Sequence, residues 1–305
     1  MKTMLNILIR AGSYIAIIIM GFVLRRIGFF KESDFSVLSK IVVRITLPAA
    51  LIVNAATREL DPQLLILALF GFCGSLFYVF VGWLLGKRRG KEAQAFNIVN
   101  ISGYNVGVFV IPFTQTFLGP TGVMAASIFD VGNAFFSLGG SCGIAAAIKT
   151  GNGFDFKRVL KALSVSVPFL VHIITFSMNL LHIPFPGPLV ECAGIISSAN
   201  TFLAMLMIGV GFHLSLSRSQ IGQILRILLV RFGLAVPLAL CYWYLLPFDR
   251  IVRLTMVILT AAPLAAAVPG FTEEIGGDVG MSCTICSLMM VISTVTIVTL
   301  LLFLL

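Results

Sequence analysis

The sequence predicts an all-α membrane protein with ten transmembrane helices, arranged as two inverted repeats of five. Three observations lead to this fold class. The 305 residues are 59% hydrophobic and 11% charged, with a mean hydropathy of +1.06, whereas a soluble domain carries roughly 25% charged residues. Ten apolar runs are long enough to cross a bilayer, which takes about 20 residues. Two of these runs, one in each half of the chain, contain glycine and proline at matching positions.

The ten expected spans are joined by short connections. They cover residues 5–24, 35–54, 63–86, 94–118, 121–148, 159–181, 188–212, 222–246, 249–272 and 280–304. The longest polar connection, 149–158, divides the chain into a first repeat, 1–150, and a second, 151–305. Because each repeat holds an odd number of spans, the second enters the membrane in the opposite orientation. The repeats must therefore be inverted.

Basic residues orient the predicted helices. The loops after spans 1, 3 and 5 hold groups of bases, namely Arg25, Arg26, Lys31, Lys87, Arg88, Arg89, Lys91, Lys149, Lys157 and Arg158. The loops after spans 2, 4, 6 and 8 hold only Arg58, Arg250 and Arg253. Basic loops stay in the cytoplasm, so we expect a multi-pass protein of the cytoplasmic membrane with both termini outside. The net charge of +9 then reflects orientation rather than nucleic-acid binding.

The residues that usually carry catalysis or bind metals are not arranged for either role. Cys283 and Cys286 form a CxxC, but neither a histidine nor a second CxxC accompanies it. The chain contains no HExxH, GxSxG or Walker A motif and no pair of carboxylates within one span. We expect neither an enzyme nor a cofactor or metal site.

The fourth predicted span contains the sequence NISGYNVGVFVIPFTQTFLG, residues 100–119. Proline lacks an N–H group and clashes with the carbonyl four residues earlier, so Pro112 predicts an interrupted helix. Unpaired backbone groups are tolerated in a membrane only where they line a cavity or meet a ligand. A half-helix that starts near Pro112 would present N–H groups and a positive dipole end to a carboxylate. Asn105 and Gly107 lie at this interruption, and the Asn105 amide can donate to the same anion.

The ninth predicted span holds the matching interruption, LTAAPLAAAVPGFTEE, with Pro263 and Pro269. Pro269 follows Pro112 by 157 residues. Inverted repeats with interrupted helices at corresponding positions are typical of secondary transporters, with the substrate site where the interruptions cross. The small residues of span 9 allow a close crossing. They leave no side-chain oxygen between Thr260 and Thr272, which argues against a sodium site. Asn100 and Tyr104 approach the crossing at helical spacing.

Ionisable residues within spans are functional candidates. Asp130, with Asn133 one helical turn later, could carry a coupled proton or pair with a base. Arg231 could pair with Asp130, attract an anionic substrate or extend toward the interface. For His172, a hydrogen-bonded core position is the favoured interpretation.

The motif NVGVFVIP resembles the N-x-G-x-x-G-x-P element of the auxin efflux carrier family, which includes plant PIN proteins and bacterial malonate and malate carriers. Asn105, Gly107 and Pro112 occupy the Asn, first Gly and Pro positions, whereas Val110 replaces the second Gly. The sequences EIGGD (274–278) and VPGFTEE (268–274) resemble further elements of the family. The resemblance extends over the whole chain.

This resemblance implies the fold shared by sodium/proton antiporters and bile-acid symporters. Spans 1, 2, 6 and 7 would form a scaffold that dimerises, and spans 3–5 and 8–10 a transport part that moves like an elevator. The implied function is secondary transport of small organic anions such as carboxylates or auxin-like acids. The expected partners are therefore the anion, membrane lipid and a second copy of the chain. The alternatives are a sodium-coupled symporter of the bile-acid type and a membrane sensor that does not transport.

Overall fold

The computed structural model describes residues 2–57, 59–214 and 217–305. All regular structure in these ranges is helical. Arg58, one of the bases counted in the predicted outer loops, lies outside them. The first half contains α1 (Lys2–Arg26), α2 (Asp34–Ile41), η1 (Val42–Thr46), α3 (Leu47–Thr57), η2 (Pro62–Leu65), α4 (Ile66–Gly86), α5 (Lys91–Ile101), η3 (Val106–Val110), α6 (Ile111–Phe117), α7 (Gly119–Phe135), η4 (Phe136–Gly140) and α8 (Ser141–Thr150). The second contains α9 (Phe156–Val165), α10 (Val167–Leu180), α11 (Gly187–Ser197), α12 (Asn200–Val210), α13 (Ile221–Leu245), α14 (Arg250–Thr260), α15 (Val268–Glu274) and α16 (Val279–Leu304).

Within the described ranges, eight helical segments are long and apolar enough to cross a membrane, and a bent pair brings the number to nine. The bent pair is α9 and α10, which meet at 72°. Pro168 is the second residue of α10, and Ser166 between the helices is extended, with φ −76° and ψ 109°. Because a proline has no N–H to donate to the carbonyl four residues earlier and clashes with it, one unbroken helix cannot run from α9 through Pro168, which accounts for the bend. The single span predicted at 159–181 is therefore two helices.

The span predicted at 249–272 also differs from one continuous helix. It consists of α14 and α15, and residues 261–267 between them form no helix. At 11 and 7 residues, α14 and α15 are each too short to cross a bilayer alone. Pro263 and Pro269 predicted an interruption of this span, and the structure shows that it extends over residues 261–267.

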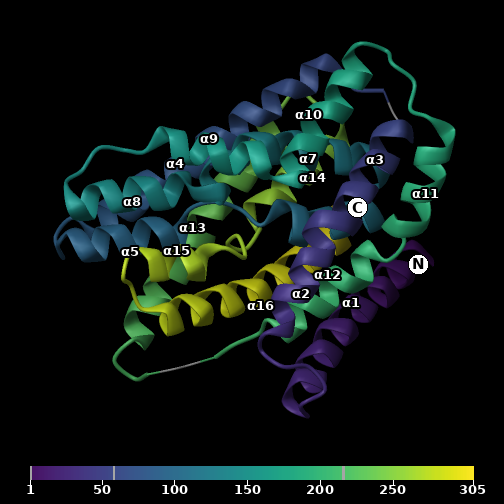
Figure 1. The fold of residues 1–305 in the computed structure, drawn as a ribbon. Helices are drawn as coiled ribbons and strands as arrows, with labels where there is room; N and C mark the ends of the chain where they lie inside the picture. The colour runs from purple at the N-terminus through teal and green to yellow at the C-terminus, as the bar shows by residue number, and fades with distance from the viewer. Residues whose placement is uncertain (1, 58, 215–216) are drawn as a thin grey trace.

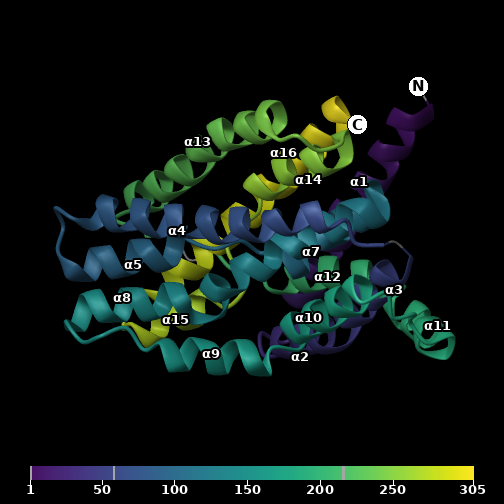
Figure 2. The ribbon, with the colours of Figure 1, turned by 90° about the horizontal axis from the view of Figure 1, so that it is seen from above.

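The helices pack into two groups. In one group α1 packs on α12, and α3 packs on α10 and α11. In the other, α4 packs on α5 and α7, α5 on α8, α13 on α14 and α15 on α16. Figure 2 shows α11, α3 and α10 toward one end, away from α4, α5 and α8. The groups meet where α7 contacts α3 and α10 and where α1 contacts α16.

Both ends of the chain lie at the same end of the molecule, as Figures 1 and 2 show from two directions. The connections between α4 and α5 and between α8 and α9 lie at the opposite end in both views. These connections and the helix ends beside them carry the basic residues predicted for the loops after spans 3 and 5. The basic groups after spans 3 and 5 and the termini therefore lie at opposite ends of the long axis drawn horizontally in Figure 1.

Glycines let the helices within each group approach closely. A Cβ atom placed on Gly132 of α7 would lie 1.8 Å from the Ala68 carbonyl oxygen of α4. A Cβ on Gly209 of α12 would lie 2.0 Å from the Ile18 carbonyl oxygen of α1. Small residues at such contacts are the usual means of helix association in a membrane.

Candidate substrate site

The interruption of span 4 begins where α5 ends. Residues 102–105 form no helix, and Gly103 adopts a φ of +76°, a conformation that favours glycine. The chain becomes helical again at Val106, so the half-helix begins six residues before Pro112 rather than near it. Pro112 is the second residue of α6, inside this continuous half-helix. The π-helical turn η3 precedes it, and its wider winding fits a proline that cannot donate to the Val108 carbonyl. Val110, at the motif's second Gly position, lies in this turn and is buried.

The interruption of span 9 lies directly against that of span 4. The Asn105 backbone N–H donates to the Pro263 carbonyl oxygen at 2.8 Å. Pro269 is the second residue of α15, the same position that Pro112 holds in α6. The structure therefore brings the two interruptions together, with residues 102–105 and 261–267 in contact.

Asn133 on α7 binds both backbone polar groups of Tyr104 in the first interruption. Its Oδ1 accepts from the Tyr104 N–H and from Ser75 Oγ, each at 3.0 Å. Its Nδ2 donates to the Tyr104 carbonyl at 2.9 Å and to Asp130 Oδ1 at 2.8 Å. One amide thus replaces both helical hydrogen bonds that Tyr104 lacks, so Asn133 fixes the path of the chain into Asn105.

A cavity of about 310 Å³ opens beside these segments. It lies between the interruptions and helices of the other packing group. Its lining comprises Phe35, Ser39, Val43, Leu47, Tyr104, Asn105, Val106, Gly107, Val108, Asp130, Ala134, Ser137, Leu138, Ser166, Pro168, Phe169, His172, Ala265, Ala266 and Ala267. The volume is at the small end of the range for ligand pockets.

Two buried polar groups on this cavity lack a hydrogen-bond partner. They are Asn105 Nδ2, in a residue 5% exposed, and His172 Nε2, in a residue 2% exposed. Buried polar groups are nearly always paired, so the side-chain amide of Asn105 is a donor available to a molecule that enters the cavity. The first N–H groups of η3, which follows Asn105, also have no partner within the helix. These groups make the cavity suited to a small anion.

Asp130 supplies the one carboxylate among the described residues that line the cavity, and that lining includes no lysine or arginine. Asn133 donates to its Oδ1. Its Oδ2 lies 3.6 Å from the position that a Cβ atom of Gly107 would take. The carboxylate therefore faces the first turn of the half-helix, where an anion would also bind.

Other predicted residues lie near the crossing but do not line the cavity. Asn100 Nδ2 donates to Thr272 Oγ1 at 3.0 Å, and its Oδ1 accepts from Ser282 Oγ at 2.6 Å, which ties α5 to α15 and α16. The Pro112 carbonyl accepts from the Tyr14 hydroxyl at 3.2 Å. Pro263 and Pro269 shape the second interruption.

Arg231 is fully buried on α13 and does not extend toward the interface. It donates to the backbone carbonyls of Ile101, Gly103 and Ala262. In the part of the chain that the structure describes, it forms no ion pair with Asp130.

The sequence interpretation did not assign His172 or Ala265–Ala267 to the site. Pro168 was the available signal for His172, because a proline in span 6 predicts an irregular segment of the kind that lines cavities. The alanines carry no functional group of their own. Only their place beside the second interruption identifies them.

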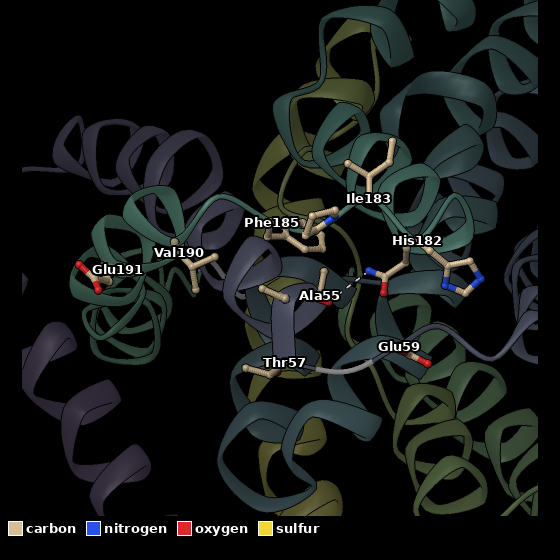
Figure 3. Close-up of a pocket in the computed structure, with 12 residues that line it drawn as sticks. Ala55, Thr57, Glu59, His182, Ile183, Phe185, Val190 and Glu191 are labelled. Carbon is tan, nitrogen blue, oxygen red and sulfur yellow. Dashed lines mark hydrogen bonds between the residues drawn. The ribbon is translucent and has the colours of Figure 1, made fainter.

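Figure 3 shows a second cavity, of about 680 Å³, between the end of α3, residues 182–187 and α11. Its lining includes the carboxylates of Glu59 and Glu191 and the amide of Asn179, which donates to the Ala55 carbonyl. This cavity lies away from the interruptions, and its two carboxylates disfavour an anion. No three His, Cys, Asp or Glu side chains of the described residues come together as metal ligands.

Comparison with known proteins finds a matching family and similar transporters. Residues 13–144 match a family described as membrane transport protein. An uncharacterized transporter of Methanothermobacter thermautotrophicus is 21% identical over 283 residues, which cover 90% of this chain and 91% of that protein. An uncharacterized transporter of Methanocaldococcus jannaschii is 24% identical over 205 residues, 63% of this chain and 65% of that protein. The matched residues 13–144 include the whole interruption of span 4.

Proposed function

We propose that this chain, whose residues 13–144 match the family described as membrane transport protein, is a secondary active carrier for small organic anions such as carboxylates. The substrate would bind in the cavity beside the crossed interruptions of spans 4 and 9. The observation that carries this proposal is the buried side-chain amide of Asn105, whose Nδ2 has no partner. It lies at the start of a half-helix whose first backbone N–H groups have no partner within the helix. A carboxylate accepts hydrogen bonds from both and is favoured by the positive end of the helix dipole.

The position of the termini supports ten membrane crossings. An odd number of crossings would separate the two ends of the chain, but both lie at the same end of the molecule (Figures 1 and 2). The described residues contain nine spans when α9 and α10 are counted as one. Counting α14 and α15 as a further broken span gives ten, an even number. The broken spans 4 and 9 then occupy corresponding positions in two inverted repeats.

The two packing groups support an elevator-like movement. The group of α1, α3, α10, α11 and α12 corresponds to the expected scaffold and provides the surface through which we propose that two copies dimerise. The other group carries both interruptions. The cavity lies between the groups, as expected for a site that one group carries past the other.

Asp130 determines when an anion can bind. A charged carboxylate that faces the first turn of the half-helix repels an anion there, and like charges repel strongly away from water. Protonation of Asp130 removes this repulsion and adds a donor. We therefore assign Asp130 the proton that accompanies the anion.

Asn105→Ala tests the site. Purified protein in liposomes should exchange labelled small carboxylates, and the variant should bind them about 10- to 100-fold more weakly, because it loses a hydrogen bond to a charged group. Asn179→Ala is the matched control, since this amide lines the second cavity and should leave binding unchanged. Weaker binding by Asn179→Ala and unchanged binding by Asn105→Ala would instead indicate that the anion binds in the second cavity. Saturable binding without any flux would instead identify a sensor.

A further inference from the structure

Arg231 is the largest fully buried side chain at the crossing, with 0% of its surface exposed. Its Nη1 donates to the Ile101 carbonyl at 2.8 Å. Its Nη2 donates to the carbonyls of Gly103 at 2.9 Å and Ala262 at 3.3 Å. One guanidinium therefore binds both interruptions at once.

The three acceptors are the carbonyls that the interruptions leave without helical partners. Ile101 is the last residue of α5, and Ala262 follows the end of α14. The end of a helix at which its carbonyls are free carries about half a negative charge. Two such ends meet at the crossing, in surroundings where a negative charge is poorly screened. A cation between the two helix ends balances the partial negative charge of each.

Aromatic rings hold this cation in place. The guanidinium carbon lies 3.9 Å from the ring centre of Tyr78 and 4.4 Å from that of Tyr104. The Tyr78 hydroxyl also donates to the backbone carbonyl of Arg231 at 3.1 Å. Cation–π contacts of this kind are strongest when the cation is removed from water.

In carriers with broken helices, unwound carbonyls and half-helix ends of this kind coordinate a coupling sodium ion. We propose that the Arg231 guanidinium is a built-in cation that takes the place of that ion, so that the crossing binds no sodium and transport needs none. Arginine keeps its charge at all accessible pH values, so the charge is permanent. Arg231 does not line the cavity. It is a positioning residue, because it fixes Gly103 and Tyr104 and thereby Asn105.

Thermal unfolding of purified wild-type protein tests the cation site without a variant and without a known substrate. The unfolding midpoint should be the same in sodium chloride and in choline chloride of equal ionic strength. A midpoint that rises selectively with sodium would overturn the proposal.

Arg231→Ala leaves the carbonyls without a cation and opens a space of the size of methylguanidinium. The midpoint of this variant should fall by several degrees, and added methylguanidinium should restore part of the loss. The matched control is Arg226→Ala on the same helix, since Arg226 donates to the Leu85 carbonyl at the end of α4. The midpoint of this control should not respond to methylguanidinium, and an equal response of both variants would refute a specific site.

Arg231→Lys provides a second comparison if Arg231→Ala cannot be purified. Because it keeps the charge, its midpoint should lie between that of the wild type and that of the uncharged Arg231→Gln. A midpoint no higher in Arg231→Lys than in Arg231→Gln would also refute the site.

The transport part of the inference rests on the proposed function and has its own measurement. Uptake into liposomes by the wild-type protein should be unchanged when choline replaces sodium on both sides. Uptake that requires sodium would overturn the inference but leave the carrier function intact. Absence of all flux would contradict the carrier function, while the thermal measurements would still decide whether Arg231 replaces a cation.

Discussion

Single residues of the first interruption have separate roles that substitution can distinguish. Gly103 has a φ of +76°, and its carbonyl is held by Arg231. Gly107 is not among the positive-φ glycines, and it faces the cavity beside Asp130. Gly103 is thus required by the backbone conformation, and Gly107 by the limited space in the cavity beside it.

Gly103→Ala should lower the free energy of unfolding by about 1–2 kcal/mol, because a residue with a Cβ pays that cost in left-handed geometry. The unfolding midpoint in detergent measures this. Gly107→Ala should leave the midpoint nearly unchanged, because its Cβ meets only the flexible end of Leu47 and Asp130 Oδ2. The same variant should weaken carboxylate binding by narrowing the cavity. Equal midpoints for the two variants would contradict this distinction.

Asp130→Asn should separate anion binding from proton coupling. The neutral amide resembles a permanently protonated carboxyl, so the variant should still exchange one labelled anion for another. Wild-type uptake should be faster when the outside is acidic, because protonation of Asp130 precedes binding. Uptake by the variant should not depend on pH. The test compares both rates in liposomes over a range of external pH, and a variant that keeps the wild-type profile would exclude Asp130 as the proton carrier.

At the scale of helices, close approach depends on glycines that touch a neighbouring backbone. Gly209→Ala on α12 should destabilise the contact with α1 by about 1–3 kcal/mol, because its Cβ would meet the Ile18 carbonyl and neither backbone can move away freely. Gly12→Ala on α1 is the control. No atom lies within 4 Å of its new Cβ, so improved helix propensity should stabilise α1 slightly. Thermal unfolding of both variants gives the comparison, and a loss of stability in Gly12→Ala would refute the role of contact.

Helix positions were predictable from the sequence, whereas the places where helices break were only partly so. Runs of about 20 apolar residues identify the spans, since a helix of that length crosses the bilayer with its backbone hydrogen bonds formed within the segment. Pro112 correctly signalled an interruption, but the helix breaks at Gly103, because the flexible glycine and the carbonyl acceptors of Arg231 lie there. The sequence marked Arg231 as a functional candidate but did not reveal its partners. Its partners are backbone carbonyls of residues whose names carry no sign of that role.

For the whole molecule, the proposed movement requires the two packing groups to slide past each other. Leu51 on α3 and Ser127 on α7 both line a narrow gap of about 10 Å³ between these groups. A short thiol cross-linker that joins Leu51→Cys to Ser127→Cys should therefore stop uptake, and reduction of a disulfide-containing linker should restore it. The experiment needs a background in which the six native cysteines are replaced, namely Cys73, Cys142, Cys192, Cys241, Cys283 and Cys286.

Each single-cysteine variant, treated in the same way, should keep its uptake. Full uptake by the cross-linked double variant would show that these surfaces do not slide. Substrate movement would then have to occur through a fixed frame.

In the proposed transport cycle, the charge of Arg231 also determines the net charge of the site that moves. An empty site with Arg231 charged and Asp130 deprotonated has a net charge of +1 − 1 = 0. A site loaded with one monoanion and a protonated Asp130 has +1 + 0 − 1 = 0. Either form crosses without work against the membrane potential, which amounts to about 2.3 kcal/mol per charge at 100 mV. The protonated but empty site carries +1, so its movement, unlike that of the other two forms, depends on the membrane potential.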